Sequence, residues 1–320
     1  MKEFGGKVAV VTGSGTGIGR ELARQLVAEG CGVAACDIIE ENLAETLSLC
    51  QAEAARGAVV TVHRCDVANE EEVQRFREEV EEQHQTSHIN LLFNNAGIGG
   101  GGSFVEAPRE EWDRTFNICW NGVYYCARAF MPMLLKSSEG HIINTSSVNG
   151  FRAALADNIP HSAYSAAKFA VKGFSEALIN DFRFNAPHLK VSVVMPGHVG
   201  SEIAVNTGRV LGHPEPKDWT DEQVESQRRA WRRRGVEGAD LDDDQIRNAV
   251  QQNLTAFRET APLTPAQAAA IILDGVREDR WRILVGKDAA AIDRAVRKAP
   301  ERTYDPDFGK LVQAEWGQRD

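Results

Sequence analysis

The sequence contains no apolar run long enough to cross a membrane. A membrane-spanning helix needs about 20 mostly apolar residues. The apolar run nearest the N-terminus, residues 8–11, is also too short for the apolar part of a secretory signal. We therefore expect a cytoplasmic protein that has no membrane partner.

Clustered positive charge and paired cysteines are also lacking. The 36 lysines and arginines are outnumbered by 46 acidic residues, and the net charge of −10 argues against nucleic acid as a partner. None of the six cysteines belongs to a CxxC pair, so we expect reduced thiols and no disulfide framework. The eight histidines are scattered along the chain, and no metal site is expected.

Short apolar, β-branched runs alternate regularly with longer amphipathic stretches. Strands buried on both faces of a parallel sheet produce such runs, and the intervening stretches are long enough to be crossover helices. We predict an α/β fold in a single domain, residues 1–320, with a doubly wound, Rossmann-type parallel sheet of about seven strands and helices on both faces. The expected strands are residues 7–12, 32–37, 58–65, 90–94, 141–145, 190–195 and 281–285, and the expected helices are 17–29, 41–56, 69–86, 109–136 and 162–185.

The alternation breaks once, between residues 201 and 262. Connections of this length are usually lids or disordered segments. Opposite charges occur close together in this segment, with arginines in residues 228–234 and aspartates in residues 240–244. They fit either a solvated pair of helices or an inserted substrate lid that is held partly by these charges.

Four alternating glycines, Gly13, Gly15, Gly17 and Gly19, lie between the first predicted strand and the first predicted helix. Free backbone amides and the positive helix end meet there, and the absence of side chains lets a pyrophosphate approach the backbone. A flexible loop would look similar in isolation. The strand before, the helix after and an acidic residue downstream favour a dinucleotide site.

The downstream acid is Asp37, at the end of the second predicted strand. Its carboxylate can accept hydrogen bonds from both hydroxyls of an adenosine ribose. A 2′-phosphate would meet like charge there, at a cost of about 4 kcal/mol per unit charge at 4 Å and an effective dielectric constant of 20. No lysine or arginine at positions 14–18 or 38–39 offsets this cost, so NAD is the expected cofactor. Alternatively, Asp37 only caps the following helix.

Tyr164 and Lys168 lie four residues apart, on one face of a predicted helix. A tyrosine that accepts a proton at neutral pH needs its pKa of about 10 lowered by about three units, equivalent to roughly 4 kcal/mol. A nearby ammonium supplies much of this by Coulomb attraction, and the positive charge of a nicotinamide adds to it. Such a pair is common on helix surfaces, so its context decides whether it is catalytic.

Six motifs in order make the chain resemble the short-chain dehydrogenase/reductase family, over about residues 4–200 and more weakly to about 300. The resemblance implies an oxidoreductase. Together with Asp37 it leads us to expect an NAD-dependent enzyme that interconverts a secondary alcohol and a ketone of a fairly apolar small molecule. It also implies a homo-oligomer, either a dimer or a homotetramer. The motifs are Thr12-Gly-xxx-Gly-x-Gly19, Asp66-Val67, Asn94-Asn-Ala-Gly97, Ile143-Asn-Thr-Ser-Ser147, Tyr164-xxx-Lys168 and Pro196-Gly197.

The resemblance also implies roles for the matching residues. Tyr164 would be the general acid/base, and Ser147 would orient the substrate oxygen. Lys168 would lower the pKa of Tyr164 and hold the nicotinamide ribose. The other residues expected along the cofactor are Asp66 and Val67 at the adenine, Ile18, Asn95, Gly97, Pro196 and Gly197 between the two ends, and Val199 and Ser201 at the carboxamide.

The chain departs from the family pattern at two places. Where the family usually has its fourth catalytic residue, an asparagine, this sequence has Cys119, and Asn117 and Asn121 cannot replace it because two residues turn a helix by about 200°. We hypothesise that Cys119 keeps the proton relay through its backbone carbonyl. The segment 151–161 is longer than usual, and its residues 154–159 either shape the substrate pocket or bulge into solvent.

Two alternatives to a dehydrogenase stay open. An epimerase or dehydratase of the extended branch would usually carry a GxxGxxG spacing instead. A dinucleotide-sensing protein without catalysis would be favoured by loss of Tyr164 or Lys168, but both are present. His161, Asp157 and His198 are expected near the site, at its rim.

Overall fold

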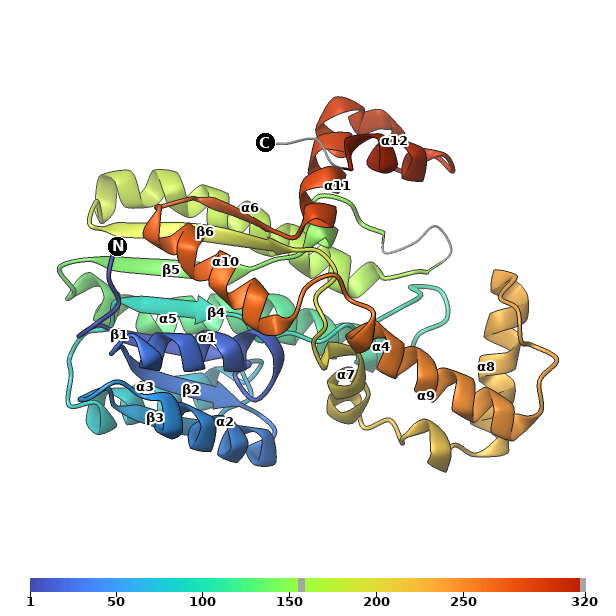
Figure 1. Cartoon of the computed structure of the whole chain (residues 1–320), viewed down its shortest axis with the longest axis horizontal. Coiled ribbons are helices and arrows are strands. Elements are labelled where there is room, and N and C mark those ends of the chain that lie inside the picture. The colour runs from blue at the N-terminus through green and yellow to red at the C-terminus, as the bar shows by residue number, and fades with distance from the viewer. Residues whose placement is uncertain (155–158, 317–320) are drawn as a thin grey trace.

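One sheet of seven parallel strands forms the centre of the computed structural model, which describes residues 1–154 and 159–316 (Figure 1). The strand order β3-β2-β1-β4-β5-β6-β7 confirms the predicted doubly wound sheet. Every strand begins and ends within two residues of its predicted bounds. The strands are β1 (Val8–Thr12), β2 (Gly32–Asp37), β3 (Val60–Arg64), β4 (Leu91–Asn94), β5 (Gly140–Thr145), β6 (Leu189–Pro196) and β7 (Arg282–Val285).

Helices cover both faces of the sheet. Successive residues of a strand point to opposite faces, so Ala9 and Val11 of β1 join one buried core and Val10 joins the other. The first core lies under α1 and α10, and the second lies under α3, α5 and α6. The bounds of these helices and of the neighbouring α2 are α1 (Gly17–Ala28), α2 (Glu40–Glu53), α3 (Glu70–Gln83), α5 (Gly122–Leu135), α6 (Ser162–Asn185) and α10 (Pro265–Arg277).

The prediction of a single helix over residues 109–136 is wrong in one respect. The chain forms α4 (Arg109–Phe116), a π-helical turn η1 (Asn117–Asn121) and then α5. A π-helical turn inserts one extra residue into a helix, and such turns occur frequently at functional sites. The apolar and polar residues continue through this stretch without a break, so their spacing gave no sign of the insertion.

All strands of the sheet run in one direction, so their carboxyl ends lie along the same edge. The order of the strands reverses between β1 and β4: β2 and β3 follow β1 toward one edge of the sheet, and β5 to β7 follow β4 toward the other. In open α/β sheets a crevice forms outside this reversal point. The glycine segment after β1 and residues 95–97 after β4 both lie there.

The long connection between β6 and α10 is helical. It forms α7 (Ile203–Leu211), η3 (Pro216–Asp218), α8 (Asp221–Arg234) and α9 (Asp243–Glu259). The helices α8 and α9 pack around Val224, Trp231 and Ile246 and project from the rest of the protein (Figure 1). The Arg228 guanidinium binds the carboxylate of Asp243, so the two oppositely charged segments hold these helices to each other.

Two further helices that the sequence analysis did not predict follow the last strand. They are α11 (Lys287–Lys298) and, after η4 (Pro300–Arg302), α12 (Phe308–Glu315). This C-terminal part contacts the long segment after β5: the side chain of Arg152 in that segment donates to the carbonyl of Thr303 at 3.3 Å. Within that segment, residues 155–158, and with them Asp157, lie outside the described residues.

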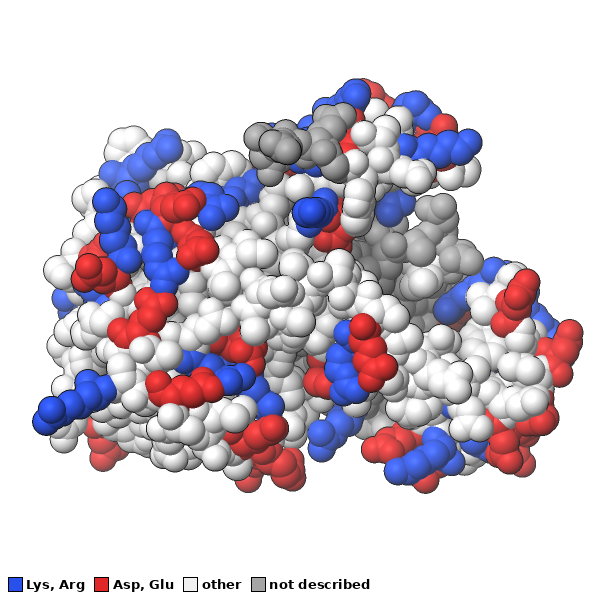
Figure 2. Space-filling model, in the orientation of Figure 1, with Lys and Arg blue, Asp and Glu red and all other residues white. Residues whose placement is uncertain are grey.

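Charged side chains of both signs are interspersed over the face of the protein that Figure 2 shows. No helix in the described part of the chain combines the length and the apolarity that a bilayer span requires.

Candidate active site

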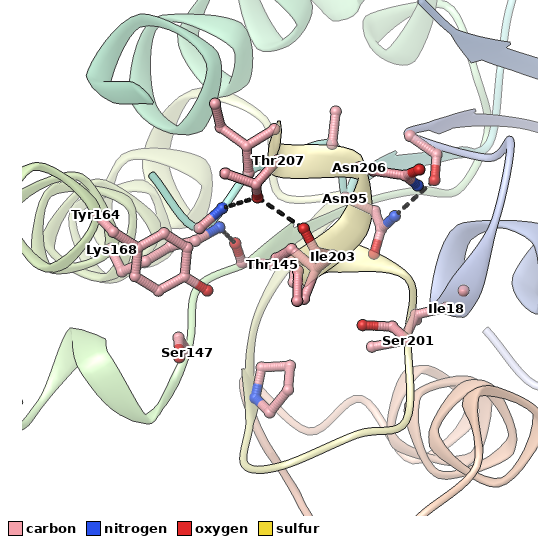
Figure 3. Close-up of a pocket in the computed structure, with 18 of the residues that line it drawn as sticks. Ile18, Asn95, Thr145, Ser147, Tyr164, Lys168, Ser201, Ile203, Asn206 and Thr207 are labelled. Atoms are coloured by element: carbon pink, nitrogen blue, oxygen red, sulfur yellow. Dashed lines mark hydrogen bonds between the residues drawn. The ribbon is translucent and has the colours of Figure 1, made fainter. Parts of the chain in front are cut away.

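A cleft of about 800 Å³ opens at the carboxyl edge of the sheet. Its walls come from the glycine segment, the ends of the strands, α6 and α7 (Figure 3). Fifteen of the eighteen residues expected at the site line it: Gly13, Gly17, Ile18, Asp37, Asp66, Val67, Asn95, Gly97, Ser147, Tyr164, Lys168, Pro196, Gly197, Val199 and Ser201. The other three, Gly15, Gly19 and Cys119, lie next to lining residues.

The glycine segment is packed so closely that side chains would not fit. Gly13 has a φ of +64°, and a Cβ there would lie 2.6 Å from the Cα of Ala96. A Cβ on Gly19 would overlap the carbonyl oxygen of Gly13. The side chain of Asn95 donates to the carbonyls of Thr12 and Gly13 and so ties the ends of β1 and β4 together. This backbone surface, followed at once by the start of α1, can hold a pyrophosphate.

Backbone amides hold Asp37 at one end of the cleft. Its Oδ2 accepts from Gly15 N at 2.9 Å, and its Oδ1 accepts from Ile39 N at 3.1 Å. The amide of Ile39 directly precedes α2, so the carboxylate also supports the start of that helix. Arg20, which directly follows the glycine segment, donates to the carbonyl of Gly15 and pairs with Glu45 at 2.7 Å.

Asp66 lies further along the same wall. Its Oδ2 pairs with the guanidinium of Arg114 at 2.7 Å, and its Oδ1 accepts from Ala68 N at 3.0 Å. Val67 beside it is buried, and a Cβ on Gly122 would collide with its side chain. These contacts fix the wall at which an adenine ring is expected.

The residues expected to catalyse the reaction meet on one side of the cleft. Ser147 follows β5, and Tyr164 and Lys168 come from the first turns of α6 (Figure 3). The Nζ of Lys168 donates to the carbonyl of Thr145 at 2.8 Å and lies 5.3 Å from the centre of the Tyr164 ring. The hydroxyl of Ser147 accepts from Asn149 N at 3.1 Å, which fixes its position at the start of η2 (Val148–Gly150).

Burial dominates the acidity of this group. It raises the pKa of Tyr164 above its usual value, the neighbouring Cys119 acts in the same direction, and a hydrogen bond with Ser147 lowers the pKa in part. Burial also lowers the pKa of Lys168, and Cys119 partly opposes that shift. The protein's own groups therefore favour a protonated phenol, so its ionisation requires additional positive charge in the cleft.

Cys119 lies in the π-helical turn η1, next to Gly97. Its thiol donates to the carbonyl of Ile98 at 3.3 Å, and burial raises its pKa. A Cβ on Gly97 would lie 3.5 Å from the Sγ of Cys119 and 3.4 Å from the Nζ of Lys168. The flanking asparagines do not take its place: the amide of Asn121 donates to the side chain of Asn117 at 2.9 Å.

Several lining residues were not predicted, among them residues of α7 and residues that follow the last strand. Asn206 and Thr207 belong to α7, which had been assigned only to a lid. Asp288 follows β7, and its Oδ2 accepts from His198 N at 2.6 Å. The general rule that sites lie beyond the carboxyl ends of strands could have indicated Asp288. Nothing in the sequence singles out Thr207.

His161 and His198 both line the cleft. The ring of His161 stacks on Tyr164, with centroids 4.6 Å apart and an interplanar angle of 21°. The ring of His198 contacts Phe257 and hydrogen-bonds its carbonyl at 2.7 Å. Within residues 1–154 and 159–316, no group of three or more histidine, cysteine or acidic side chains is placed to hold a metal ion.

Comparison with known proteins shows the family. A family model described as short chain dehydrogenase matches residues 7–210. The chain is 34% identical over 300 residues to "Putative oxidoreductase SadH" of Mycobacterium tuberculosis, which covers 93% of this chain and 92% of that protein. It is 31% identical over 206 residues to the human "Dehydrogenase/reductase SDR family member 11", which covers 64% of this chain and 77% of that protein. The protein belongs to the short-chain dehydrogenase/reductase family of oxidoreductases.

Solved structures agree with this assignment. A short-chain dehydrogenase/reductase from Burkholderia phymatum in complex with NAD superposes with a TM-score of 0.74 at 30% identity, covering 96% of this chain and 98% of that one. A metagenomic short-chain oxidoreductase in complex with NADP gives a TM-score of 0.53 at 32% identity, covering 61% and 83%. The similar structures thus include complexes with either dinucleotide.

The close packing of the glycine segment leads to a first prediction. In the variant Gly19→Ala the added methyl group must displace Gly13, so NADH affinity is expected to fall at least about tenfold, equivalent to ~1.4 kcal/mol. Quenching or enhancement of NADH fluorescence on titration measures this. Gly309→Ala is the matched control, because a Cβ there meets nothing within 4 Å. Unchanged affinity in Gly19→Ala would show that the dinucleotide does not bind at this segment.

Proposed function

We propose that this protein is an NAD-dependent dehydrogenase that interconverts a secondary alcohol and the matching ketone of a fairly apolar small molecule. The observation that carries the proposal is the meeting of Ser147, Tyr164 and Lys168 in the same cleft as the glycine segment. A cytoplasmic location and the assignment of residues 201–262 to a lid within a single domain are parts of the same proposal.

The bound dinucleotide supplies the acceptor or donor of hydride at its nicotinamide ring. The glycine segment would hold its pyrophosphate, and Asp37 its adenosine ribose. Val199 and Ser201 would hold the carboxamide. The site fits a dinucleotide because the backbone at Gly13 and Gly19 is bare, and a Cβ at either position would fill the space.

During oxidation of the alcohol, the Oη of Tyr164 accepts the proton of the substrate hydroxyl. The hydrogen on the carbon that bears this hydroxyl leaves with its electron pair, as hydride to the dinucleotide. Ser147 donates a hydrogen bond to the substrate oxygen as charge shifts there. Burial raises the pKa of Tyr164, so the Lys168 ammonium and the positive charge of the oxidised dinucleotide must together stabilise the phenolate. In the reverse direction Tyr164 returns the proton to the oxygen.

Beyond the catalytic residues the cleft is lined mainly by aliphatic and aromatic side chains. They include Ile98, Ile118, Val148, Ile203, Val210 and Phe257. Ala154 and Ile159, the described residues on either side of positions 155–158 in the long segment after β5, also line the cleft. Apolar walls favour binding of an apolar carbon skeleton, which supports the proposed class of substrate.

The position of Asp37 leads to a prediction about the cofactor. We expect kcat/KM to be at least about a hundredfold higher with NAD than with NADP, because like charge at the ribose costs several kcal/mol. The variant Asp37→Ser should narrow this ratio by at least about tenfold, whereas Glu41→Ser, an exposed acid nearby, should not. A screen of secondary alcohols and ketones at 340 nm with both dinucleotides measures the ratios. Equal use of NAD and NADP by the unchanged protein would contradict the proposed cofactor.

Removal of the Tyr164 hydroxyl tests the proposed acid/base. Tyr164→Phe should lower kcat by about a thousandfold, within the range for loss of a general acid/base, and leave the dissociation constant of NADH within about threefold. Tyr124→Phe on the exposed side of α5 is the control, since it removes the same atom away from the cleft. Retention of most of the turnover by Tyr164→Phe would exclude this residue as the acid/base.

The role proposed for Cys119 is to keep a proton relay through its backbone carbonyl. Its thiol already donates to Ile98, so the side chain has a local partner of its own. Replacing Cys119 by asparagine should therefore change kcat by less than about tenfold, because the carbonyl is retained. Steady-state kinetics decide this. A hundredfold gain would mean that the natural enzyme is impaired in its relay.

We also propose that the protein is a homo-oligomer, a dimer or a tetramer. Leu135 at the end of α5 and Phe169 on α6 are large apolar side chains that lie exposed. Large exposed apolar side chains on neighbouring helices are typical of an interface.

A further inference from the structure

Gly99, which follows β4 and lines the cleft, is hydrogen-bonded through both its amide and its carbonyl. Its amide donates to the Oγ1 of Thr207 in α7 at 2.8 Å. Its carbonyl accepts from the Nε2 of His161 at 2.9 Å. One residue without a side chain therefore connects the helix that covers the cleft with the helix that carries Tyr164.

Thr207 is fixed as a hydrogen-bond acceptor toward Gly99. Its hydroxyl donates its single hydrogen to the carbonyl of Ile203 at 2.6 Å, so its oxygen faces the amide of Gly99 as an acceptor (Figure 3). The preceding residue, Asn206, donates to the Oγ1 of Thr16 in the glycine segment at 3.0 Å. Consecutive residues of α7 thus contact the segments after β4 and after β1.

His161 is fixed in one tautomer. A carbonyl oxygen only accepts, so the Nε2 of His161 must carry the hydrogen, and its Nδ1 is the unprotonated nitrogen. Burial lowers the pKa of His161, although the hydrogen bond to Gly99 opposes part of this shift. The neutral ring lies nearly parallel to the Tyr164 ring, at 4.6 Å between centroids. A displacement of His161 would therefore change the contact that holds Tyr164.

The segment around Gly99 has little freedom to absorb a displacement. A Cβ on Gly100 would lie 2.6 Å from the Oγ1 of Thr115 in α4. Gly101 has a φ of +66°, and a Cβ there would lie 2.5 Å from the Cβ of Ala163 in α6. Close packing between α4 and α6 means that movement at Gly99 is passed on to its partners.

We propose that the chain of contacts Thr207–Gly99–His161 couples the seating of α7 on the cleft to the orientation of Tyr164, so that Thr207 and His161 are positioning residues for catalysis. The inference rests on the proposed function of Tyr164 as acid/base. It assigns a role to α7 beyond that of a cover: the phenol is aligned with the substrate only while α7 is in contact with Gly99.

A double-mutant cycle on the full-length protein tests the coupling. Thr207→Val removes the acceptor at nearly constant volume, and His161→Phe keeps a stacking ring but removes the donor. Each should lower kcat about tenfold, because a small misplacement of a catalytic group is costly. The double variant should also lose only about tenfold, since both changes break one connection. Thr207→Ser, which keeps the hydroxyl, should have the kcat of the unchanged protein. The dissociation constant of NADH should stay within about twofold of that of the unchanged protein in every variant.

Hydrogen exchange of the cofactor-free protein gives a second readout that does not depend on activity. Peptides covering residues 97–102 should exchange faster in Thr207→Val and in His161→Phe than in the unchanged protein. Thr260→Val is the matched control, because the exposed Thr260 makes the same type of bond, to the carbonyl of Ala256 at 2.8 Å. It should change neither exchange in residues 97–102 nor kcat.

Losses that multiply to about a hundredfold in the double variant would show that the two residues act independently and would overturn the coupling. Unchanged kcat in both single variants would overturn it as well, as would faster exchange without any loss of kcat. If the unchanged protein oxidises no alcohol with NAD, the proposed function fails. The coupling between α7 and His161 is then still decided by exchange: unchanged protection of residues 97–102 in both variants excludes it.

Discussion

Parallel pairing of the strands is the constraint on which the rest of the structure depends. It brings the ends of β1, β4 and β5 to one edge of the sheet, although these ends are more than 130 residues apart along the chain from Thr12 to Thr145. The backbone segments that follow can then approach each other closely. The close approach of Gly13 to Ala96, which Asn95 braces, is one result of this arrangement. It leaves a bare backbone surface beside the polar group formed by Ser147, Tyr164 and Lys168.

Burial and charge act against each other at this polar group. The surroundings of Tyr164 and Lys168 raise the pKa of the phenol and lower that of the amine, so each group is pushed toward its neutral form. A phenolate at Tyr164 would therefore need positive charge close by. A dinucleotide in its oxidised form brings such charge to the cleft, whereas the reduced form does not. The acidity of Tyr164 would in this way follow the redox state of the cofactor.

The sheet could be predicted closely because its strands are short apolar runs with sharp ends, such as the run that ends at Thr12. Residues with a chemical reason for their type, such as Gly13 and Asp37, could also be placed. The π-helical turn at Cys119 could not, because no proline or charged residue within residues 117–121 marks the place of the extra residue. The contacts of Gly99 could not be predicted either, since they join segments that are 62 and 108 residues away in sequence. Only the packed fold brings Thr207 and His161 to the same residue, Gly99.

The central claim is that the phenol of Tyr164 lies within proton-transfer reach of a secondary alcohol bound next to NAD. A crystal structure of the protein with NAD and a secondary alcohol that it oxidises tests this most directly. We predict that the Oη of Tyr164 lies about 2.6–3.2 Å from the alcohol oxygen, with Ser147 on the same oxygen. An alcohol bound with its oxygen directed away from Tyr164, or a phenol turned toward bulk solvent, would contradict the claim.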